Sequence, residues 1–380
     1  MSEQNTMTTE IDRTDLVVDA ELVPAQHAIG GGAVEAYDPA AAAVLAALEQ
    51  GADEHIAAVR PRKTKVSYAR DWTLWTEFHT WLAGRTGTML PLTAVTKGTI
   101  VGFTVWLDEV KQAAPTTIDR RITGVTVTAC SKGATVPKEA TLAARQLVKR
   151  FRNDPARMAR GRGKAVPMTP AHIKAMNTAD RIVPKKPGSR RRRREYAVPE
   201  LARLRDRSAS SMRFGIAGRN EEVSALDDTG IKLIAEGLDV HVPSVKGRPP
   251  RDVIVYYGEH PDTCPVRCWL AWQQAKLAAG AAPGGPAYLP VDQWGHLGTQ
   301  RLSPDGCGRA ITRAAQQAGV DAHLTGHSGR RGLVNTGRKR GKRVEKLRAQ
   351  GGWSPKSPVF WEYVDDADRT EDAATDGIGL

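Results

Sequence analysis

Near its C-terminal end the sequence reads Thr325-Gly-His-Ser-Gly-Arg330, which places His327 and Arg330 three residues apart. Side chains at this spacing lie on the same side of a helix, so the two are expected to face one site. Gly351-Gly-Trp353 follows about 23 residues later, and Tyr363 stands ten residues beyond the tryptophan. Each fragment alone is weak evidence, but their order and spacing together are informative.

A second informative stretch lies upstream. Gly215-Ile-Ala-Gly-Arg219 leads into Asn-Glu-Glu222-Val-Ser-Ala-Leu226. Arg219 and Glu222 are one helical turn apart and precede the apolar Val223 and Leu226, which favours a helix that begins near the arginine.

Between these two stretches the spacing of apolar residues changes. It is three to four residues in the helical segments and becomes every second residue here. Leu238, Val240 and Val242 alternate with polar residues, and a second apolar run occupies residues 253–256. The turn between them is Lys246-Gly-Arg-Pro-Pro250. This pattern predicts a β-hairpin in a mostly helical region. Helices are expected around it, from Pro199 to about Gly215 and from 265 to 363, with a glycine- and proline-rich loop at 279–304.

The first half of the chain predicts a compact all-α bundle. Four apolar stripes recur there at three- and four-residue steps, which is the helical period. Thr116 and Thr117 are expected to cap the third helix. The stripes are Tyr68, Trp72, Trp75, Phe78 and Leu82; Ile100, Phe103, Leu107 and Val110; Ile118, Ile122 and Val125; and Leu142, Leu147, Val148 and Phe151.

Two further segments flank the bundle. Residues 1–38 are polar and without periodicity, so they are expected to be largely disordered, and a short helix is expected from Pro39 to Leu48. The basic, glycine-containing segment 158–167 reads as an interdomain linker.

After the linker, Thr169-Pro170 reads as an N-cap followed by proline at the first helical position. The arginine run 190–194 is expected to be an exposed loop, in which solvated charge and phosphate contact remain equal alternatives.

The charge of the chain is strongly segregated. Its 380 residues include 55 Lys or Arg and 42 Asp or Glu, a net charge of +13. Residues 1–59 carry eleven acids against one arginine, and residues 364–380 carry six acids against one arginine. The segment 60–363 therefore holds 53 bases and 25 acids, a net charge of +28. This favours a polyanionic partner, with an ordinary solvated surface as the plainer alternative.

Several classes of protein are disfavoured. The longest apolar run, Ala40 to Leu48, is nine residues, whereas a membrane span needs about 20, so we expect a soluble protein without a membrane partner. The absence of a signal peptide predicts a cytoplasmic, nucleoid-associated location and reduced thiols. No metal or other cofactor is expected, because structural zinc usually needs a second ligand pair beside Cys264 and Cys268. Neither a phosphate-binding loop nor a two-metal nuclease site is present as a motif.

Taken as an ordered set, these segments resemble the tyrosine recombinase (phage integrase) family, in particular simple site-specific recombinases of the Cre/Xer kind. The resemblance covers about 60–366. It implies a mainly α fold with a small β-hairpin or sheet: a helical core-binding domain at 60–157, the linker 158–167, and an α+β catalytic domain at 168–366. The family forms a C-shaped clamp around DNA. The acidic, largely disordered segment 1–59 and the acidic tail 367–380 would lie outside these domains.

The resemblance also implies a catalytic residue set. Arg219, His327 and Arg330 match the family's arginine and His-x-x-Arg positions, Trp353 a position filled by His or Trp, and Tyr363 the nucleophile. Lys246 falls on the hairpin turn where the family keeps a mobile lysine, and Glu222 at an acidic position behind the first arginine.

These residue types suit DNA breakage without a metal. A tyrosine can attack phosphorus and conserve the bond energy as a phosphotyrosine, while two arginines hold the nonbridging oxygens bidentately. His327 can donate to an oxygen or move a proton, Lys246 can protonate the leaving 5′-oxygen, and Glu222 orients Arg219. No nucleotide would be needed.

DNA contact outside this set is expected from basic residues near the bundle, the linker and the catalytic segments. The implied partners are double-stranded DNA with a specific target site, a homotetramer on two such sites, and an accessory or directionality factor. The expected DNA-contacting residues are Lys63, Lys65, Arg160, Arg162, Lys164, Arg190, Arg191, Arg192 and Arg331.

Plainer alternatives exist for single residues and for the whole chain. Arg219 could be one more phosphate contact, Tyr363 a core tyrosine and Trp353 a purely structural residue, and hairpin lysines such as Lys246 are commonly solvated. A type IB topoisomerase or a telomere resolvase would use a similar constellation, and a catalytically silent DNA-binding protein could retain the fold. Three features depart from the family pattern: Gly329, where leucine is commoner; a Trp353-to-Tyr363 step one residue longer than usual; and the arginine run 190–194.

Overall fold

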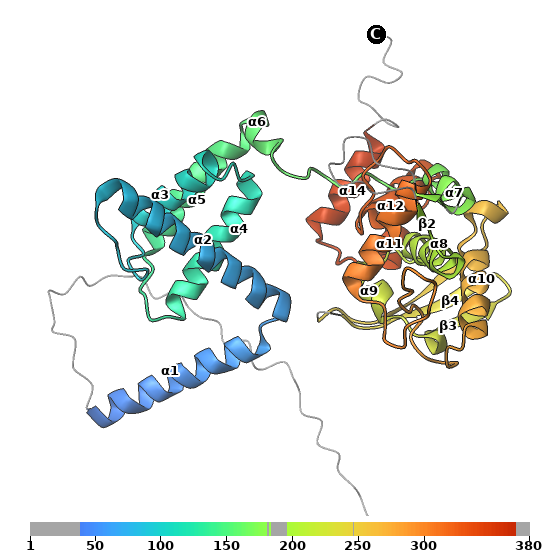
Figure 1. Cartoon of the computed structure of the whole chain (residues 1–380), viewed down its shortest axis with the longest axis horizontal. Coiled ribbons are helices and arrows are strands. Elements are labelled where there is room, and N and C mark those ends of the chain that lie inside the picture. Colours follow the sequence, from blue (N-terminus) through green and yellow to red (C-terminus); the bar gives the residue numbers. More distant parts are fainter. Residues whose placement is uncertain (1–38, 181, 184–195, 246, 370–380) are drawn as a thin grey trace, which may run out of the picture. The chain divides into compact units, whose positions relative to one another are not determined.

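The computed structural model describes residues 39–180, 182–183, 196–245 and 247–369 (Figure 1). The chain divides into two compact units, Met1–Met158 and Ala159–Leu380. Most of the described residues are helical. Among them, no helix is both long and apolar enough to cross a membrane.

The first unit is built on four helices that coincide with the four apolar stripes of the sequence. A single turn, α6 (Pro155–Met158), follows them. The four are α2 (Arg62–Thr86), α3 (Lys97–Glu109), α4 (Pro115–Cys130) and α5 (Lys138–Arg152).

The core of this unit is aromatic. The rings of Trp75 and Phe103 meet edge to face with centroids 5.2 Å apart, and the ring of Phe78 lies 5.6 Å from that of Phe103. All three side chains are at most 2 % exposed. The indole N–H of Trp75 donates to the carbonyl oxygen of Leu92 at 2.9 Å, so its one polar group is satisfied inside the core.

The helix starts follow local chemistry, with one difference from expectation. Thr96 caps α3 by accepting from the backbone N–H of Thr99 at 3.2 Å. Helix α4 begins at Pro115 with Ala114 as its N-cap, so the expected capping role of Thr116 and Thr117 is wrong. Proline has no N–H to satisfy and its φ suits the first helical position, so the helix starts before the threonines.

A further helix, α1 (Pro39–Val59), precedes the bundle and runs past the expected end at Leu48. The residues beyond Leu48 are mostly good helix formers, and the single Gly51 costs only about 1 kcal/mol relative to alanine. Apart from the partly buried Gly51, the residues of this helix whose burial is described are exposed. The expected disorder of 1–38 concerns residues outside the described part of the chain.

The second unit is mainly helical. Helix α8 (Glu200–Gly215) packs against α10, α11 and α12 and lies at the centre of this unit. Thr169 caps α7, with Pro170 at its first position, as expected. The other helices are α7 (Pro170–Thr178), α9 (Asn220–Ala225), α10 (Pro265–Ala278), α11 (Pro304–Gln317), α12 (Ser328–Lys339), α13 (Val344–Gln350) and α14 (Pro358–Asp368), with short 3-10 turns η1 (Asp228–Gly230) and η2 (Pro261–Thr263).

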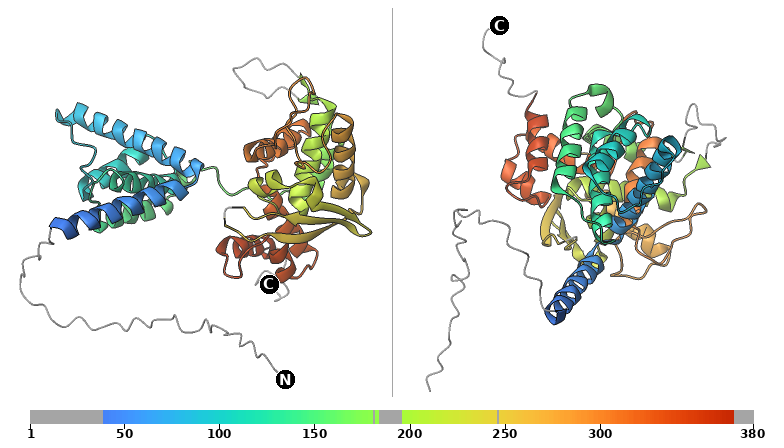
Figure 2. Two further views of the ribbon diagram at one scale, coloured as in Figure 1. Left: turned by 90° about the horizontal axis from the view of Figure 1, so that it is seen from below. Right: turned by 90° about the vertical axis from the view of Figure 1, so that its left-hand side faces the viewer.

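The predicted hairpin is part of a three-stranded antiparallel sheet of order β3-β4-β5, which lies against α8 and α10 (Figure 2). Strands β4 (Gly237–Val242) and β5 (Arg251–Tyr256) pair with Val240 opposite Val253. Strand β3 (Ile231–Ile234) was not expected, because it is short and mostly exposed. A separate two-stranded pair joins β1 (Ile182–Val183) to β2 (Tyr196–Ala197).

Candidate active site

The segment that carries Arg219 is a tight turn between α8 and α9. Ala217 has a φ of 46°, in the left-handed region that non-glycine residues rarely adopt, and its side chain is completely buried. The N–H of Gly218 donates to the carbonyl oxygen of Arg213 at 2.8 Å and closes the end of α8. This turn places Arg219 at the N-cap of α9, with its side chain 22 % exposed.

Glu222 is the buried carboxylate that connects the arginines of the site. It accepts from the backbone N–H of Arg219 at 2.9 Å and from Nη1 of the same residue at 2.6 Å. Arg251 donates to it at 3.2 Å, and Nη1 of Arg330 lies 3.6 Å away. Burial raises the pKa of Glu222. The hydrogen bond and charge of Arg251, the backbone hydrogen bond of Arg219 and the charge of Arg330 together outweigh burial and hold the pKa below its ordinary value.

Arg330 lies on the first turn of α12 and is 2 % exposed. It donates to the main-chain carbonyls of Ala217 and of Gly351, the second at 3.0 Å. Its guanidinium also stacks on the ring of Trp353 at 4.0 Å. Burial, followed by the charge of Arg219, lowers the pKa of Arg330 to about 9, so the group remains charged at neutral pH. Arg330 therefore joins the turn that carries Arg219 to the turn at Gly351 that precedes Trp353.

His327 stands directly before α12 and is exposed on the surface of the site. Partial desolvation of the ring lowers the pKa of His327, and the charges of Arg330, Arg219 and Arg213 lower it further. The imidazole is consequently neutral at pH 7, with one nitrogen free to accept a proton.

Trp353 and Tyr363 form the apolar side of the site. A Cβ at Gly351 would overlap the Trp353 ring, so this glycine lets the indole fold back over its own turn. The rings of Trp353 and Tyr363 meet edge to face at 6.2 Å, and the tyrosine is 7 % exposed. Burial raises the pKa of Tyr363 despite the opposing charges of Arg330 and Arg331, so its phenol is protonated at neutral pH.

The additional residue between Trp353 and Tyr363 is accommodated in the loop before α14. The N–H of Ser357 donates to the carbonyl oxygen of Ser354 at 3.1 Å, and the indole N–H of Trp361 donates to the carbonyl oxygen of Pro355 at 3.1 Å. Across this ten-residue step the rings of Trp353 and Tyr363 remain in contact.

Ion pairs hold α14 against its neighbours. Arg331, 8 % exposed, pairs with Asp366, and its guanidinium lies 5.5 Å from the ring centre of Tyr363. Lys164 pairs with Glu362 at 2.6 Å and lies 3.7 Å from Asp366. The expected DNA contacts of Arg331 and Lys164 stay predictions, but in this structure both cations face acids of the tyrosine helix.

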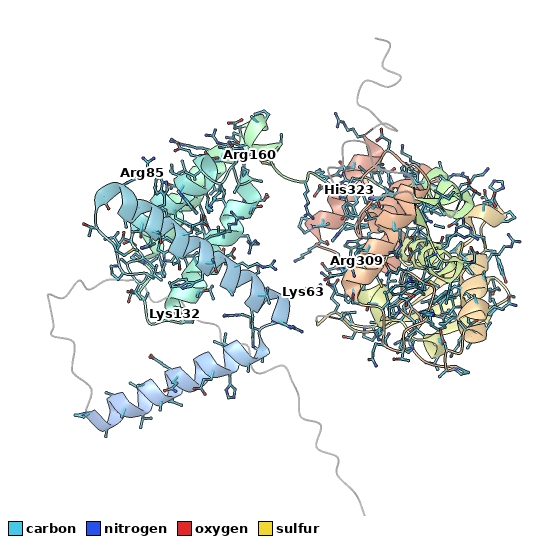
Figure 3. All side chains as sticks on the ribbon, viewed as in Figure 1. Lys63, Arg85, Lys132, Arg160, Arg309 and His323 are labelled. Carbon is cyan, nitrogen blue, oxygen red and sulfur yellow. The ribbon has the colours of Figure 1, made fainter. Side chains whose placement is uncertain are left out.

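The remaining predicted DNA contacts are scattered along the chain. Lys63 and Lys65 are exposed on the first turn of α2, Arg162 is exposed in the linker, and Arg160 is partly buried just after α6. Figure 3 labels Lys63 near the start of α2 and Arg160 beyond α6. Lys246, Arg190, Arg191 and Arg192 lie outside the described residues.

Three polar residues near the site belong to none of the sequence motifs. Arg251 donates to Gln350 O at 3.0 Å and to Ile216 O at 3.2 Å, in addition to Glu222. Gln350 donates to Gly215 O at 2.8 Å and ties α13 to the end of α8. Arg213 is completely buried and donates to the carbonyl oxygen of Gly326, the residue before His327. Their partners are distant in sequence, and no motif distinguishes these residues from others in a basic chain.

The donor set suits an anion. Within the described part of the chain, no group of three or more His, Cys, Asp or Glu side chains is arranged to hold a metal ion. Arg219, Arg251 and Arg330 surround the single carboxylate of Glu222, which leaves positive charge for an incoming phosphate. Neutral His327 and the phenol of Tyr363 complete a set that can bind an anion, accept a proton and supply a nucleophile.

Comparison with known proteins gives matches in structure but none in sequence. The sequence matches no family model and no curated protein. Among solved structures, a lambda integrase dimer bound to a COC′ core site gives a TM-score of 0.50 at 16% identity and covers 84% of this chain and 95% of the integrase chain. XerA recombinase gives 0.38 at 16% identity over 83% and 93%, and a Tn1549 transposon integrase in complex with circular intermediate DNA gives 0.49 at 14% over 83% and 95%. The fold of this chain thus resembles that of lambda integrase.

Proposed function

We propose that this chain is a site-specific DNA recombinase that cleaves and rejoins DNA through a 3′-phosphotyrosyl intermediate on Tyr363. In this proposal 60–157 is the DNA-binding core-binding domain, 168–366 the catalytic domain and 158–167 their linker. The acidic segments 1–59 and 367–380 lie outside both domains.

One observation carries the proposal. Arg219 and Arg330, which are 111 positions apart, both approach the buried carboxylate of Glu222, and Arg330 stacks on the tryptophan that packs against Tyr363. A structural role for each residue alone would not require this convergence. The lambda integrase of the comparison is bound to DNA, and its fold supports DNA as the partner here.

The first chemical step would be attack by the Tyr363 oxygen on the scissile phosphorus. The new Tyr–O–P bond forms as the bond from phosphorus to the 5′-oxygen breaks. The phenol proton would pass to the neutral imidazole of His327, because the raised pKa of Tyr363 prevents its loss to bulk water at neutral pH. Arg219 and Arg330 would stabilise the charge that develops on the nonbridging oxygens.

The second requirement is a proton for the leaving 5′-oxygen. We assign this proton to Lys246 from its position on the hairpin turn between β4 and β5, although Lys246 lies outside the described residues. Rejoining would reverse the step: a 5′-hydroxyl attacks the phosphotyrosine, and the phenol recovers its proton. Neither a nucleotide nor a metal ion enters this scheme.

Recombination needs more than one protomer. We propose that four protomers act on two specific sites and exchange strands pairwise through a Holliday junction, with an accessory or directionality factor as a further partner. The net charge of +28 in 60–363 supports tight contact with DNA phosphates. Affinity for duplex DNA should therefore decrease steeply with salt concentration.

The test is covalent trapping on a nicked suicide substrate. A library of nicked duplexes with randomised sequence would be incubated with the full chain, and denaturant-resistant protein–DNA adducts would be collected and sequenced. We expect an adduct with the wild type and none with Tyr363→Phe. Tyr256→Phe is the matched control, because Tyr256 is an exposed tyrosine of the same unit and should leave adduct formation unchanged.

Other results would point elsewhere. An adduct that persists in Tyr363→Phe would contradict the nucleophile assignment. Duplex binding without any adduct would favour a silent DNA-binding protein. Relaxation of supercoiled DNA that needs no paired sites would favour a type IB topoisomerase, and hairpin-ended products would favour a telomere resolvase.

A further inference from the structure

A completely buried arginine lies beneath the proposed active site. Arg213, in the last turn of α8, has no solvent exposure. Its Nη1 donates to the side-chain oxygen of Asn220 and to the carbonyl oxygen of Gly326, the latter at 3.3 Å, and its Nη2 donates to the carbonyl oxygen of Cys307 at 2.9 Å. All of these acceptors are uncharged. Within the described residues, its Nε is buried without a hydrogen-bond partner.

A buried guanidinium that donates only to uncharged acceptors is costly, because the charge loses its hydration. The charge of Glu221 favours the guanidinium but does not outweigh its burial. Burial accordingly lowers the pKa of Arg213 from its ordinary value. Methionine or leucine would fill the same space without this cost. The arginine therefore calls for an explanation beyond packing.

The surrounding backbone leaves room for this particular side chain. A Cβ at Gly329 would lie 3.0 Å from Cγ and 3.2 Å from Cδ of Arg213. A Cβ at Gly326 would overlap the Asn220 amide, and one at Gly308 would lie 2.9 Å from the nitrogen of that amide. Glycines on α11, in the turn before α12, and on α12 thus surround the Arg213–Asn220 pair.

The contacts of Arg213 connect the two arms of the site. Asn220 directly follows Arg219, and Gly326 directly precedes His327. One planar guanidinium therefore links the residue beside the first arginine to the residue beside the histidine, although the two are 106 positions apart. Its third contact, to α11, fixes the link to the centre of the unit.

We propose that Arg213 is a positioning residue that holds His327 in register with Arg219, a role that rests on the proposed recombinase chemistry. The fork of the guanidinium matters, since a lysine ammonium could not span the same acceptors in one plane.

The charge of Arg213 has a second effect. His327 is faced by Arg213 from α8, by Arg219 and Glu221 from the α9 region, and by Arg330 from α12; the three arginines lower the pKa of His327, whereas Glu221 raises it.

The experiment separates the fork from the charge. Arg213→Lys keeps the charge and removes the fork, whereas Arg213→Met removes both. Three quantities would be measured on the full chain: the rate of covalent adduct formation at saturating DNA, the dissociation constant for duplex DNA, and the pKa of His327. The pKa would come from NMR of histidine-labelled protein, with the resonance assigned from His327→Gln. Arg203→Met is the matched control, because Arg203 is an arginine of the same helix paired with Glu200.

Both variants should form adduct about 10²-fold more slowly, since a displacement of about 1 Å in a reacting group can cost that much. The dissociation constant for DNA should change less than about twofold. The pKa of His327 should rise in Arg213→Met and stay near the wild-type value in Arg213→Lys. Arg203→Met should match the wild type in all three measurements.

Gly329→Ala is a second way to disturb the link, because the added methyl group meets the Arg213 side chain without removing its charge. It is expected to slow adduct formation while the pKa of His327 stays low, and it keeps the proposal testable if Arg213→Met does not fold. Wild-type rates in folded Arg213→Lys and Gly329→Ala would overturn the positioning role. If the wild type itself formed no adduct, the recombinase proposal would fail. An unchanged His327 pKa in folded Arg213→Met would overturn the link independently of that outcome.

Discussion

The α2–α5 bundle and the region around α8 and α12 stabilise their interiors in different ways. The bundle packs aromatic and aliphatic side chains such as Trp75 and Phe103, which are fully buried. The bundle also buries two acids, Asp71 and Asp108, which pair with Arg120 and Arg157. The second region instead buries both signs of charge, because Glu222, Arg213 and Arg330 are all at most 2 % exposed. An apolar interior tolerates a change of shape, whereas a buried ionic network fails when one member is removed. The difference separates the part of the chain that serves as scaffold from the part whose geometry is tied to chemistry.

The largest effect is expected from Glu222→Ala. Removal of this carboxylate leaves Arg219, Arg251 and Arg330 facing one another without compensation, which should cost about 3–5 kcal/mol of the free energy of unfolding of the second unit. Amide hydrogen exchange, read on peptides of each unit in the full chain, measures this locally. Glu236→Ala, at an exposed turn of the same unit, is the control. A loss below about 1 kcal/mol would mean that the network is not the main support of this region.

The same carboxylate predicts a pH dependence. Because the pKa of Glu222 is lowered in the folded chain, its contribution is fully present above the ordinary glutamate value of about 4.3. As the pH falls below that value, the unfolded state binds the proton first, so stability decreases until the lowered pKa is passed. Protection of second-unit amides should therefore decline more steeply below about pH 4.3 in the wild type than in Glu222→Gln.

A smaller effect is expected from Gly332→Ala, at a position where helix α12 closely approaches another backbone segment of the second unit. A Cβ at Gly332 on α12 would overlap the carbonyl of Met168, a main-chain atom that cannot rotate away. Gly332→Ala should cost about 1–3 kcal/mol in the stability of this unit. Gly84→Ala on α2 is the matched comparison, because nothing lies near that position. It should stabilise the bundle by about 0.5–1 kcal/mol. If both substitutions lowered the free energy of unfolding, or both raised it, the contrast between the units would be contradicted.

The smallest loss is expected from Phe103→Leu in the bundle. The residue is fully buried among aromatic rings, but leucine retains most of its apolar volume, so neighbouring side chains can repack. We expect less than about 1.5 kcal/mol in the free energy of unfolding of the first unit, again from hydrogen exchange. A loss as large as that of Glu222→Ala would show that the aromatic core is as intolerant of change as the ionic network.

The same contrast explains what the sequence could predict. The four bundle helices were predictable because their apolar stripes have a local period of three to four residues. The hairpin of β4 and β5 was predictable from alternation, although β3, with Leu233 mostly exposed, was not. The predicted capping role of Thr116 and Thr117 was wrong because Pro115 starts the helix before them.

The site was predictable only in part. Arg219, Glu222, His327, Arg330, Trp353 and Tyr363 could be selected from their order and spacing, and the structure brings them together. Arg213, Arg251 and Gln350 could not, since each acts through carbonyls or side chains from distant segments. A guanidinium whose acceptors are main-chain oxygens leaves no pattern in the amino-acid types around it.

The close approach of Arg213 to Gly329 also has an evolutionary consequence. A side chain at position 329 and a long side chain at position 213 would compete for the same volume. Among homologous sequences, the two positions should therefore covary, with leucine or another large residue at 329 only where 213 is small. A lineage that changed one position first would pass through a strained or a hollow intermediate, so the pair should behave as a single inherited unit.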